Sequence, residues 1–286
     1  MSRTVLVVGA AGGVGGALVK ALLKRKYSVI GTVLNAGEAA AVRAASPTIN
    51  EIVEVDLGNA DSALESIKRI LNRQPVELAG AVVCAAISPY GPVEITPLAR
   101  LRQTLEINTV ADVAVFQAAM PSLRQSKGKM IFVASFAGKV AMPFIGHYTA
   151  SKHALEGISD VMRQEARPFG VPVVLIEPGG IKTTMVTNQI ATIGRDRAAL
   201  SPDHSNLYGG LFERFERMLH KGASMGLEPM QVAKVIVTAL EADKPKSRYV
   251  VGKDSAALIR TRRRSSDETM DEMFRQIYEN PDALPS

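Results

Sequence analysis

Short runs of β-branched and apolar residues alternate with longer segments of helical spacing along most of this chain, and this alternation restricts the fold more than any other feature. The strand-like runs lie at 4–9, 27–33, 51–55, 80–86, 129–135, 172–178 and 247–252. Helical spacing is found at 15–26, 38–45, 62–71, 98–120, 147–167 and 229–242. Parallel strands need crossover connections, and runs without polar alternation fit a sheet that is covered on both sides. The sequence therefore predicts an α/β fold, a doubly wound seven-stranded parallel sheet with helices on both faces.

The alternation is interrupted between residues 179 and 228. This segment is rich in Gly, Thr, Asn, Asp and His, and its one amphipathic piece is 211–221. Because long segments without clear elements are commonly functional, we expect 187–228 to form a substrate-binding lid on a domain spanning 1–254. Ordinary core packing of the apolar stripe at 211–219 is an equal alternative. Residues 255–286 are expected to form a charged helical tail.

The composition is that of an ordinary globular protein. The chain has 286 residues, 47% of them hydrophobic and 22% charged, which is enough to bury a core without a metal or a disulfide. Cys84 has no second cysteine to pair with, so we expect a reducing compartment. No stretch approaches the roughly 20 apolar residues that a membrane helix needs, and the N-terminal apolar run is too short for a signal peptide. We therefore expect a cytoplasmic protein without a membrane span.

The formal net charge of +6 raises the question of nucleic acid as a partner. The basic residues are spread along the chain, with one cluster at Arg260, Arg262, Arg263 and Arg264. Aromatic residues make up only 5% of the chain, which leaves little for stacking on bases. We expect no nucleic-acid binding and interpret the cluster as solvated, with contact to a phosphate, a membrane or a partner left open.

A glycine-rich turn separates the first strand-like run from the first helical segment. Its glycines are Gly9, Gly12, Gly13 and Gly15, with the spacing G-x-x-x-G-x-G between Gly9 and Gly15. Glycines at such a turn let backbone N–H groups at a helix N-terminus approach a dinucleotide pyrophosphate. Tight packing alone is the alternative reading. The position of the turn favours a Rossmann-like dinucleotide-binding fold.

Four polar residues form a second constellation. Tyr148 and Lys152 are four residues apart in a predicted helix, so the Lys152 ammonium lies beside the Tyr148 phenol. A nearby cation favours a phenolate, which makes a phenol a usable acid or base for an alcohol or carbonyl oxygen. Ser135 ends the fifth strand-like run, where ligands of open α/β sheets bind, and Asn108 lies in the preceding helix. Taken singly, each of these residues is an ordinary surface or turn residue, but the combination is harder to obtain by chance.

Other chemistries lack their motifs. The histidines His147, His153, His204 and His220 do not form metal-ligand spacing with carboxylates, so we expect no metal. The chain has no G-x-S-x-G element, and the turn at Gly9–Gly15 lacks the terminal Gly-Lys-Ser/Thr of a P-loop. A nucleophile-elbow hydrolase and a P-loop nucleotidase are therefore not indicated.

These motifs fall in the order and approximate spacing of the short-chain dehydrogenase/reductase family, which the chain resembles over about residues 4–252. The stretch 148–183 is most similar to the hydroxysteroid and retinol dehydrogenase branch. The resemblance implies that Tyr148 is the catalytic acid/base and that Ser135 orients the reacting oxygen. Lys152 is then expected to bind the nicotinamide ribose and to depress the tyrosine pKa, and Asn108 to complete the tetrad through a water.

The resemblance also implies a set of cofactor-binding residues. They are Gly9, Ala11, Gly12, Gly13, Val14, Gly15, Asn35, Asp56, Leu57, Cys84, Ala85, Ala86, Tyr148, Lys152, Pro178, Gly179, Ile181 and Thr183. The chain departs from the family pattern where Cys84-Ala85-Ala86 replaces Asn-Ala-Gly and where Val8 replaces Thr. Residues 32–35 offer neither the carboxylate that grips a ribose 2′-hydroxyl nor an Arg for a 2′-phosphate. The absence of repulsion favours NADP, with NAD left open.

The expected function is hydride transfer between a nicotinamide cofactor and a secondary alcohol or ketone. The predicted substrate-binding residues are Ile87, Phe136, Met142, Phe144, Met185 and Phe215. These walls are apolar, so we expect a hydrophobic or cyclic substrate that is steroid-like or retinoid-like. The alternative is a non-catalytic NAD(P)-sensing protein on the same fold, which would not need the acid/base set.

A homodimer or homotetramer is expected by extension from the family. Its interface is expected on the helices near 98–120 and 147–167, with Ala111, Val115, Ala119 and Leu155 as candidate contacts.

Overall fold

The protein folds around one parallel sheet, as the sequence predicted. The computed structural model describes residues 3–73 and 77–279. Its seven strands are ordered β3-β2-β1-β4-β5-β6-β7, and every neighbouring pair is parallel. The strands are β1 (Thr4–Val8), β2 (Ser28–Val33), β3 (Glu51–Glu54), β4 (Leu78–Val83), β5 (Lys129–Val133), β6 (Val173–Pro178) and β7 (Arg248–Val251). The order reverses between β1 and β4, which places a ligand crevice at the carboxyl ends of these strands.

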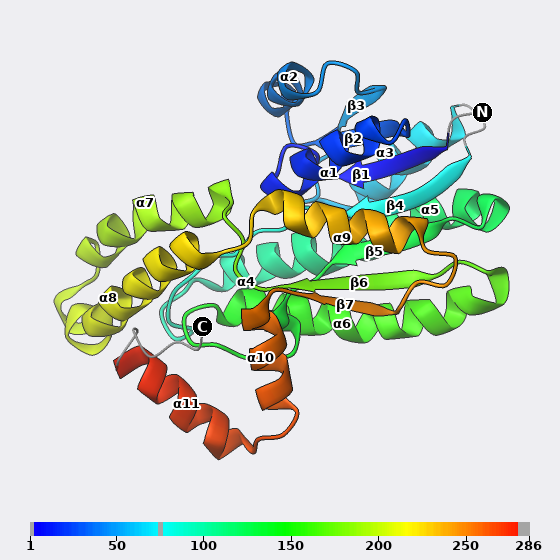
Figure 1. The fold of residues 1–286 in the computed structure, drawn as a ribbon. Helices are drawn as coiled ribbons and strands as arrows, with labels where there is room; N and C mark the ends of the chain where they lie inside the picture. The colour runs from blue at the N-terminus through cyan, green and yellow to red at the C-terminus, as the bar shows by residue number, and fades with distance from the viewer. Residues whose placement is uncertain (1–2, 74–76, 280–286) are drawn as a thin grey trace.

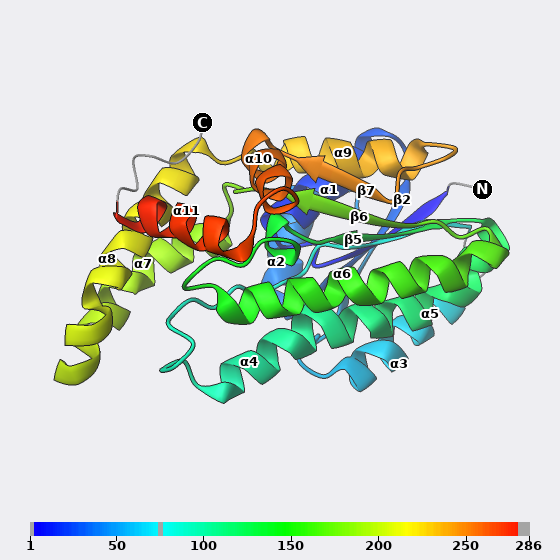
Figure 2. The ribbon, with the colours of Figure 1, turned by 90° about the horizontal axis from the view of Figure 1, so that it is seen from below.

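The helices that cross between strands cover both faces of the sheet (Figure 2). They are α1 (Gly13–Lys24), α2 (Ala36–Ala45), α3 (Ala60–Asn72), α4 (Leu98–Leu105), α5 (Ala111–Ser126), α6 (Gly146–Ala166) and α9 (Pro229–Glu241). One core cluster joins the sheet to α3, α5 and α6, and a second joins it to α1 and α9. The strands β1, β4 and β6 are buried along their whole length, which explains their lack of polar alternation.

The segment after β6 departs from the sequence-based expectation. Only 211–221 was predicted to be helical there, but the structure has two helices, α7 (Thr184–Ala198) and α8 (Pro202–Met225). On α7 only Gln189 and Ile193 are buried, so its apolar stripe is too narrow to be recognised. The start of α8 is fixed by Ser201, whose hydroxyl accepts from the backbone N–H of His204. The two helices pack against each other and extend away from the sheet (Figure 1).

The predicted tail forms helices that return to the body of the protein. Helix α10 (Lys253–Arg262) packs beside β7, and α11 (Asp267–Glu279) lies against α8. The buried side chains of α11 are Met270, Phe274, Ile277 and Tyr278. The Tyr278 hydroxyl donates to the carbonyl of Pro143, 2.8 Å away, in the loop before α6. Residues 280–286 of the predicted tail lie outside the described residues.

The four candidate oligomer contacts are core residues. Ala111, Val115, Ala119 and Leu155 have no exposed surface and belong to the cluster between the sheet and α3, α5 and α6. The expectation that they form a subunit interface is therefore wrong, because the inner face of each helix was taken for its outer face. Within the described residues, no helix combines the length and hydropathy that would let it cross a bilayer.

Candidate active site

The glycine turn is packed so closely that side chains would not fit at its key positions. Gly9 has φ +84°, and a Cβ there would lie 2.7 Å from the Cβ of Ala85 at the end of β4. A Cβ at Gly15 would collide with the Gly9 carbonyl, and one at Gly13 would lie 3.0 Å from Cγ2 of Thr183. The turn, the end of β4 and the loop after β6 therefore meet at the N-terminus of α1. This bare backbone is a suitable cradle for a dinucleotide pyrophosphate.

The Glu38 carboxylate, from the first turn of α2, lies at the end of β2 and was not among the predicted site residues. Asn35 caps α2 by accepting from the N–H of Glu38, 3.0 Å away. The Glu38 carboxylate reaches back to accept from the N–H of Leu34 at 2.8 Å. The prediction of cofactor preference considered residues 32–35 and therefore did not include Glu38. An Asn followed three residues later by Glu is nevertheless a recognisable capping pattern. Asp56, predicted to contact the adenine, is exposed and accepts from the N–H of Gly58.

Asn108 lies in a π-helical turn, Glu106–Val110, between α4 and α5, and has no exposed surface. Its Oδ1 accepts from the Ile87 N–H at 2.9 Å, and its Nδ2 donates to the Ile87 carbonyl at 2.8 Å and to the Ser151 hydroxyl at 3.0 Å. The Ser151 hydroxyl donates in turn to the Tyr148 carbonyl at 2.7 Å. Asn108 therefore ties the chain after β4 to the first turns of α6. Such π-turns occur frequently at functional sites.

Lys152 reaches from α6 toward the end of β5. Its side chain is 1% exposed, and its Nζ donates to the Val133 carbonyl at 3.0 Å. The same Nζ lies 5.8 Å from the centre of the Tyr148 ring. Ser135, two residues beyond Val133, is buried and accepts from the N–H of Ala137. The four predicted catalytic residues thus come from the chain segments gathered around the carboxyl ends of β4 and β5.

The loop after β6 is held by the C-terminal helices. The Asp254 carboxylate accepts from the N–H of Gly180 at 2.8 Å, and a Cβ at Gly179 would collide with it. The Ser255 hydroxyl donates to the Glu177 carbonyl at 3.0 Å. The segment carrying Pro178, Gly179, Ile181 and Thr183 is therefore positioned by the beginning of α10.

Two titratable groups, the partly buried Cys84 and the buried Asp112, interact electrostatically with Lys152. Burial raises the pKa of the Cys84 thiol to about 12, so the thiol is neutral at working pH. Burial also raises the pKa of Asp112 to about 7, an effect that the charge of Lys152 opposes. Sequence reasoning did not select Asp112, although an Asp on the inner side of an otherwise apolar helix is a signal that it could have used.

The predicted substrate side is a packed aromatic cluster. The rings of Phe144 and Phe215 stack with centres 5.1 Å apart, and Phe212 meets Phe144 edge-on at 4.9 Å. Phe144 and Phe215 are only 5% and 3% exposed. Phe144 has φ +71°, a conformation that is strained for a bulky residue and that is often found at functional sites.

The other predicted substrate contacts differ in exposure. Phe136 and Met142 are partly buried against the same aromatic cluster, as is Tyr148. Ile87 is partly exposed and is held through its backbone by Asn108, whereas Met185 is 36% exposed on α7.

Polar contacts hold α7 and α8 over the chain that follows β4. The Tyr90 hydroxyl donates to Asp196 at 2.6 Å and lies 2.7 Å from the Thr192 hydroxyl. The Gln189 amide donates to the Ser88 carbonyl at 2.6 Å, and Tyr208 donates to Glu94. Because they involve the segment predicted to be a lid, we call these four contacts the lid contacts. They join α7 and α8 to the segment between β4 and α4.

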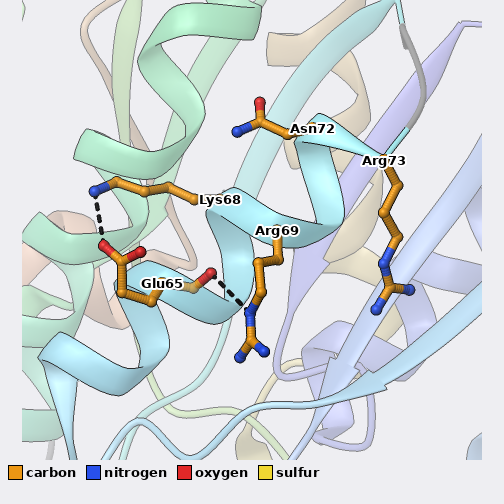
Figure 3. A pocket seen from close by; sticks show the side chains of 5 residues that line it. All are labelled: Glu65, Lys68, Arg69, Asn72 and Arg73. Carbon is orange, nitrogen blue, oxygen red and sulfur yellow. Dashed lines mark hydrogen bonds and ion pairs between the residues drawn. The ribbon is translucent and has the colours of Figure 1, made fainter.

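Two surface hollows lie away from this arrangement. One is lined only by side chains of α3 and its end, Glu65, Lys68, Arg69, Asn72 and Arg73, with Lys68 paired to Glu65 at 2.9 Å (Figure 3). Arg73 also forms an ion pair with Glu51 at the start of β3. This hollow therefore lies away from the carboxyl ends of the strands, where the predicted tetrad is found. The other is lined by Arg260, Arg263 and Arg264 together with Val250, Ala256 and Ile259. Neither hollow contains a residue of the predicted tetrad.

Comparison with known proteins gives consistent matches. Residues 3–194 match the model of the short chain dehydrogenase family. The chain is 33% identical to an NADPH-dependent 3-dehydrocapnine reductase of Ornithobacterium rhinotracheale, over 87% of this chain and 88% of the relative. It is 29% identical to human 17-beta-hydroxysteroid dehydrogenase type 1, over 92% of this chain and 81% of the relative. A solved short-chain dehydrogenase from Streptomyces avermitilis aligns with a TM-score of 0.75 at 20% identity, covering 99% of this chain and 98% of that one.

Proposed function

The chain belongs to the short-chain dehydrogenase family and is an NAD(P)-dependent oxidoreductase, and from that premise we propose that it interconverts a hydrophobic or cyclic secondary alcohol and its ketone. The observation that carries this proposal is the buried Lys152 ammonium held beside the Tyr148 ring at the ends of β4 and β5. Without an acid/base group at that place, a nicotinamide could bind but no proton would follow the hydride.

The residues of the site divide the work of proton transfer. Tyr148 gives its phenolic proton to the carbonyl oxygen in reduction and takes it back in oxidation. The Lys152 ammonium lies beside the Tyr148 ring, and the Val133 carbonyl holds it in position. Ser135 orients the reacting oxygen, and Asn108 fixes the turn of α6 that carries Tyr148.

The residues present fit a nicotinamide dinucleotide. The glycine turn with α1 holds the pyrophosphate, Lys152 holds the nicotinamide ribose, and the loop from Pro178 to Thr183 lies on the nicotinamide side. The cofactor supplies the hydride chemistry when bound. NADP is the preferred form in this proposal, which the NADPH-dependent bacterial relative supports. The Glu38 carboxylate at the end of β2 opposes that preference, so the ratio of kcat/KM for NADPH and NADH decides the point.

The substrate class follows from the apolar character of the region next to Tyr148. Phe136 and Met142, which are partly exposed beside the packed Phe144–Phe215 stack, offer no charged group to a substrate. A flat or cyclic carbon skeleton buries more of this surface than a small polar hydroxy acid does. The similarity to a human hydroxysteroid dehydrogenase supports a ring substrate of this kind.

Tyr148→Phe tests the assignment. This substitution removes the transferable proton and keeps the ring, so we expect turnover of a cyclic ketone panel to fall at least about 100-fold while NADPH binding changes little. Tyr27→Phe is the matched control, because Tyr27 is partly buried and lies just before the amino end of β2, away from the carboxyl ends of the strands. Turnover by Tyr148→Phe within a few-fold of the wild type refutes the proposal.

A further inference from the structure

Phe144 has a backbone conformation that its neighbours must enforce. It lies in the loop that leads into α6, four residues before Tyr148, and its φ of +71° is strained for a bulky side chain. Such a conformation persists only where the surrounding structure fixes it. The contacts on either side of Phe144 therefore show which parts of the chain shape the region beside Tyr148.

The chain after β4 holds the peptide group that follows the Phe144 Cα. The Phe144 carbonyl accepts from the Gly91 N–H at 2.8 Å. The first residue of α6 is packed against the same segment, since a Cβ at Gly146 would lie 2.6 Å from Cγ2 of Val93. This side of the loop is therefore fixed by the segment between β4 and α4.

The C-terminal helix α11 holds the peptide group that precedes the Phe144 Cα. The Tyr278 hydroxyl donates to the Pro143 carbonyl at 2.8 Å, and Tyr278 is only 4% exposed. A buried phenol needs a hydrogen-bond partner, and this one finds it on a loop that lies 135 residues earlier in the chain. Because φ of Phe144 sets the orientation of this peptide group, the hydrogen bond opposes a return to negative φ.

Helix α11 also belongs to the apolar cluster on the predicted substrate side. Its apolar side chains are buried in the cluster that contains Phe144, and Tyr148 and Met142 are partly buried against the same cluster. Helix α11 contacts α8, whose Phe215 ring stacks on Phe144 at 5.1 Å. The loop that Tyr278 holds therefore carries two residues of this cluster, one on each side of the hydrogen-bonded carbonyl.

We propose that Tyr278 is a positioning residue whose hydrogen bond holds the loop 142–144 beside Tyr148 and thereby sets how well a bulky ketone binds. The inference rests on the proposed function in placing the substrate next to Tyr148. Without this hydrogen bond, the peptide group before Phe144 is free to turn and the strained φ relaxes. A bulky ring that reaches Met142 then loses contact area, whereas a small ketone, which fills only the space at Tyr148, does not.

Two ketones of different size test this role. In Tyr278→Phe, which keeps the ring and removes the hydrogen bond, we expect the KM for the bicyclic ketone 1-decalone to rise about fivefold. The KM for butanone and the kcat for both ketones should change less than about twofold. General damage to the fold would instead lower the kcat for both ketones.

Tyr249→Phe is the matched control, because it also removes a tyrosine hydroxyl that bonds to the backbone. That hydroxyl accepts from the Lys246 N–H at 3.2 Å, and Tyr249 packs against the sheet and α1–α9 cluster instead of the Phe144 cluster. Its KM for 1-decalone should match that of the wild type. The inference is overturned by an unchanged KM for 1-decalone in Tyr278→Phe, by an equal rise for butanone, or by an equal rise in Tyr249→Phe.

Amide hydrogen exchange of the protein without cofactor or substrate separates this inference from the proposed function. The Gly91 N–H reports on the loop, because its acceptor is the Phe144 carbonyl. Tyr278→Phe should accelerate exchange at Gly91 about fivefold and leave exchange in β4 unchanged. Unchanged exchange at Gly91 overturns the inference even if the enzyme is active. If the wild type does not reduce 1-decalone, the proposed function has failed in its substrate class, and exchange at Gly91 alone decides whether Tyr278 positions the loop.

Discussion

Two groups of charged residues in this protein differ in whether their members form direct ion pairs. The first, which we call the Arg248 cluster, joins Arg248 and Lys139 to three carboxylates, those of Glu156, Asp160 and Glu177. The second is the pair Asp112 and Lys152. Arg248 lies 2.9 Å from both Glu156 and Asp160 and 3.2 Å from Glu177, and Lys139 lies 2.8 Å from Glu156. In the second group, the carboxylate and the ammonium are both buried without a direct ion pair.

The difference follows from the position of each group. The planar guanidinium of Arg248 presents several donors at once, so one side chain can bind carboxylates from α6 and β6 and fasten β7 to the sheet. The Lys152 ammonium instead donates to the carbonyl of Val133 and lies beside the Tyr148 ring. Every charged group of the Arg248 cluster has an ion-pair partner, although Glu156 Oε1 and both carboxylate oxygens of Glu177 lack a hydrogen bond within the described residues.

Removing the central cation of the Arg248 cluster should have the largest effect. Arg248→Met leaves Glu156 and Glu177 buried without their main counter-charge, so we expect a loss of about 3–5 kcal/mol in the free energy of unfolding. Urea denaturation at neutral pH measures it. Arg275→Met is the control, because Arg275 pairs with Glu272 and Glu279 on the exposed side of α11 and should cost less than about 1 kcal/mol. Equal losses in the two variants would show that the cluster is no stronger than a surface network.

Replacing Asp112 should have the opposite sign at neutral and higher pH. Its pKa is about 7 in the folded protein against 3.8 for an ordinary Asp, so the folded state holds the proton more tightly. The stability from this group is present below pH 4 and is lost as the pH rises to about 7. Three pKa units correspond to at most about 4 kcal/mol, so Asp112→Asn should be more stable than the wild type at pH 8 and no more stable at pH 4. Parallel denaturation midpoints across this range would contradict the unsatisfied character of the pair.

The sequence predicted neither of these two groups as such, and only Lys152 was selected from them. Tyr148 and Lys152 were found because their spacing on a helix brings them together whatever the rest of the fold does. Asp112 was not selected because its burial depends on which face of α5 is turned inward, and Ala111 and Val115 show that this face was misjudged. The seven strands were predicted because continuous apolar runs signal a sheet covered on both faces.

The segment predicted to be a lid also shows how far a fold can be predicted from sequence. Helix α7 buries too few apolar residues to give a period, and its position depends on contacts that join residues about a hundred positions apart, such as Tyr90 with Asp196. Likewise α11 was read as part of a charged tail, although its apolar stripe packs on α8. A polar contact such as that of Tyr90 with Asp196 leaves no local pattern in a sequence, whereas the stripe of α11 does, and only its packing partner was unpredictable.

The smallest expected effect concerns Tyr90, whose hydroxyl joins α7 to the chain after β4. Burial and the hydrogen bond to Asp196 raise the pKa of Tyr90 to about 12, so its hydroxyl stays a donor at working pH. Tyr90→Phe removes that bond and keeps the ring beside Phe215, so we expect a loss of about 1 kcal/mol in the local stability of α7. Amide hydrogen exchange in α7 should then be about five times faster, while exchange in β1 and β4 stays unchanged.

Because the lid contacts hold α7 and α8 and lie outside the tetrad, this change should raise the KM for a bulky ketone a few-fold and leave kcat nearly unaltered. Tyr208→Phe removes a more exposed lid contact, to Glu94, and should accelerate exchange less. If exchange in β4 accelerates as much as exchange in α7, Tyr90 stabilises the whole fold, as Arg248 does, and not α7 alone.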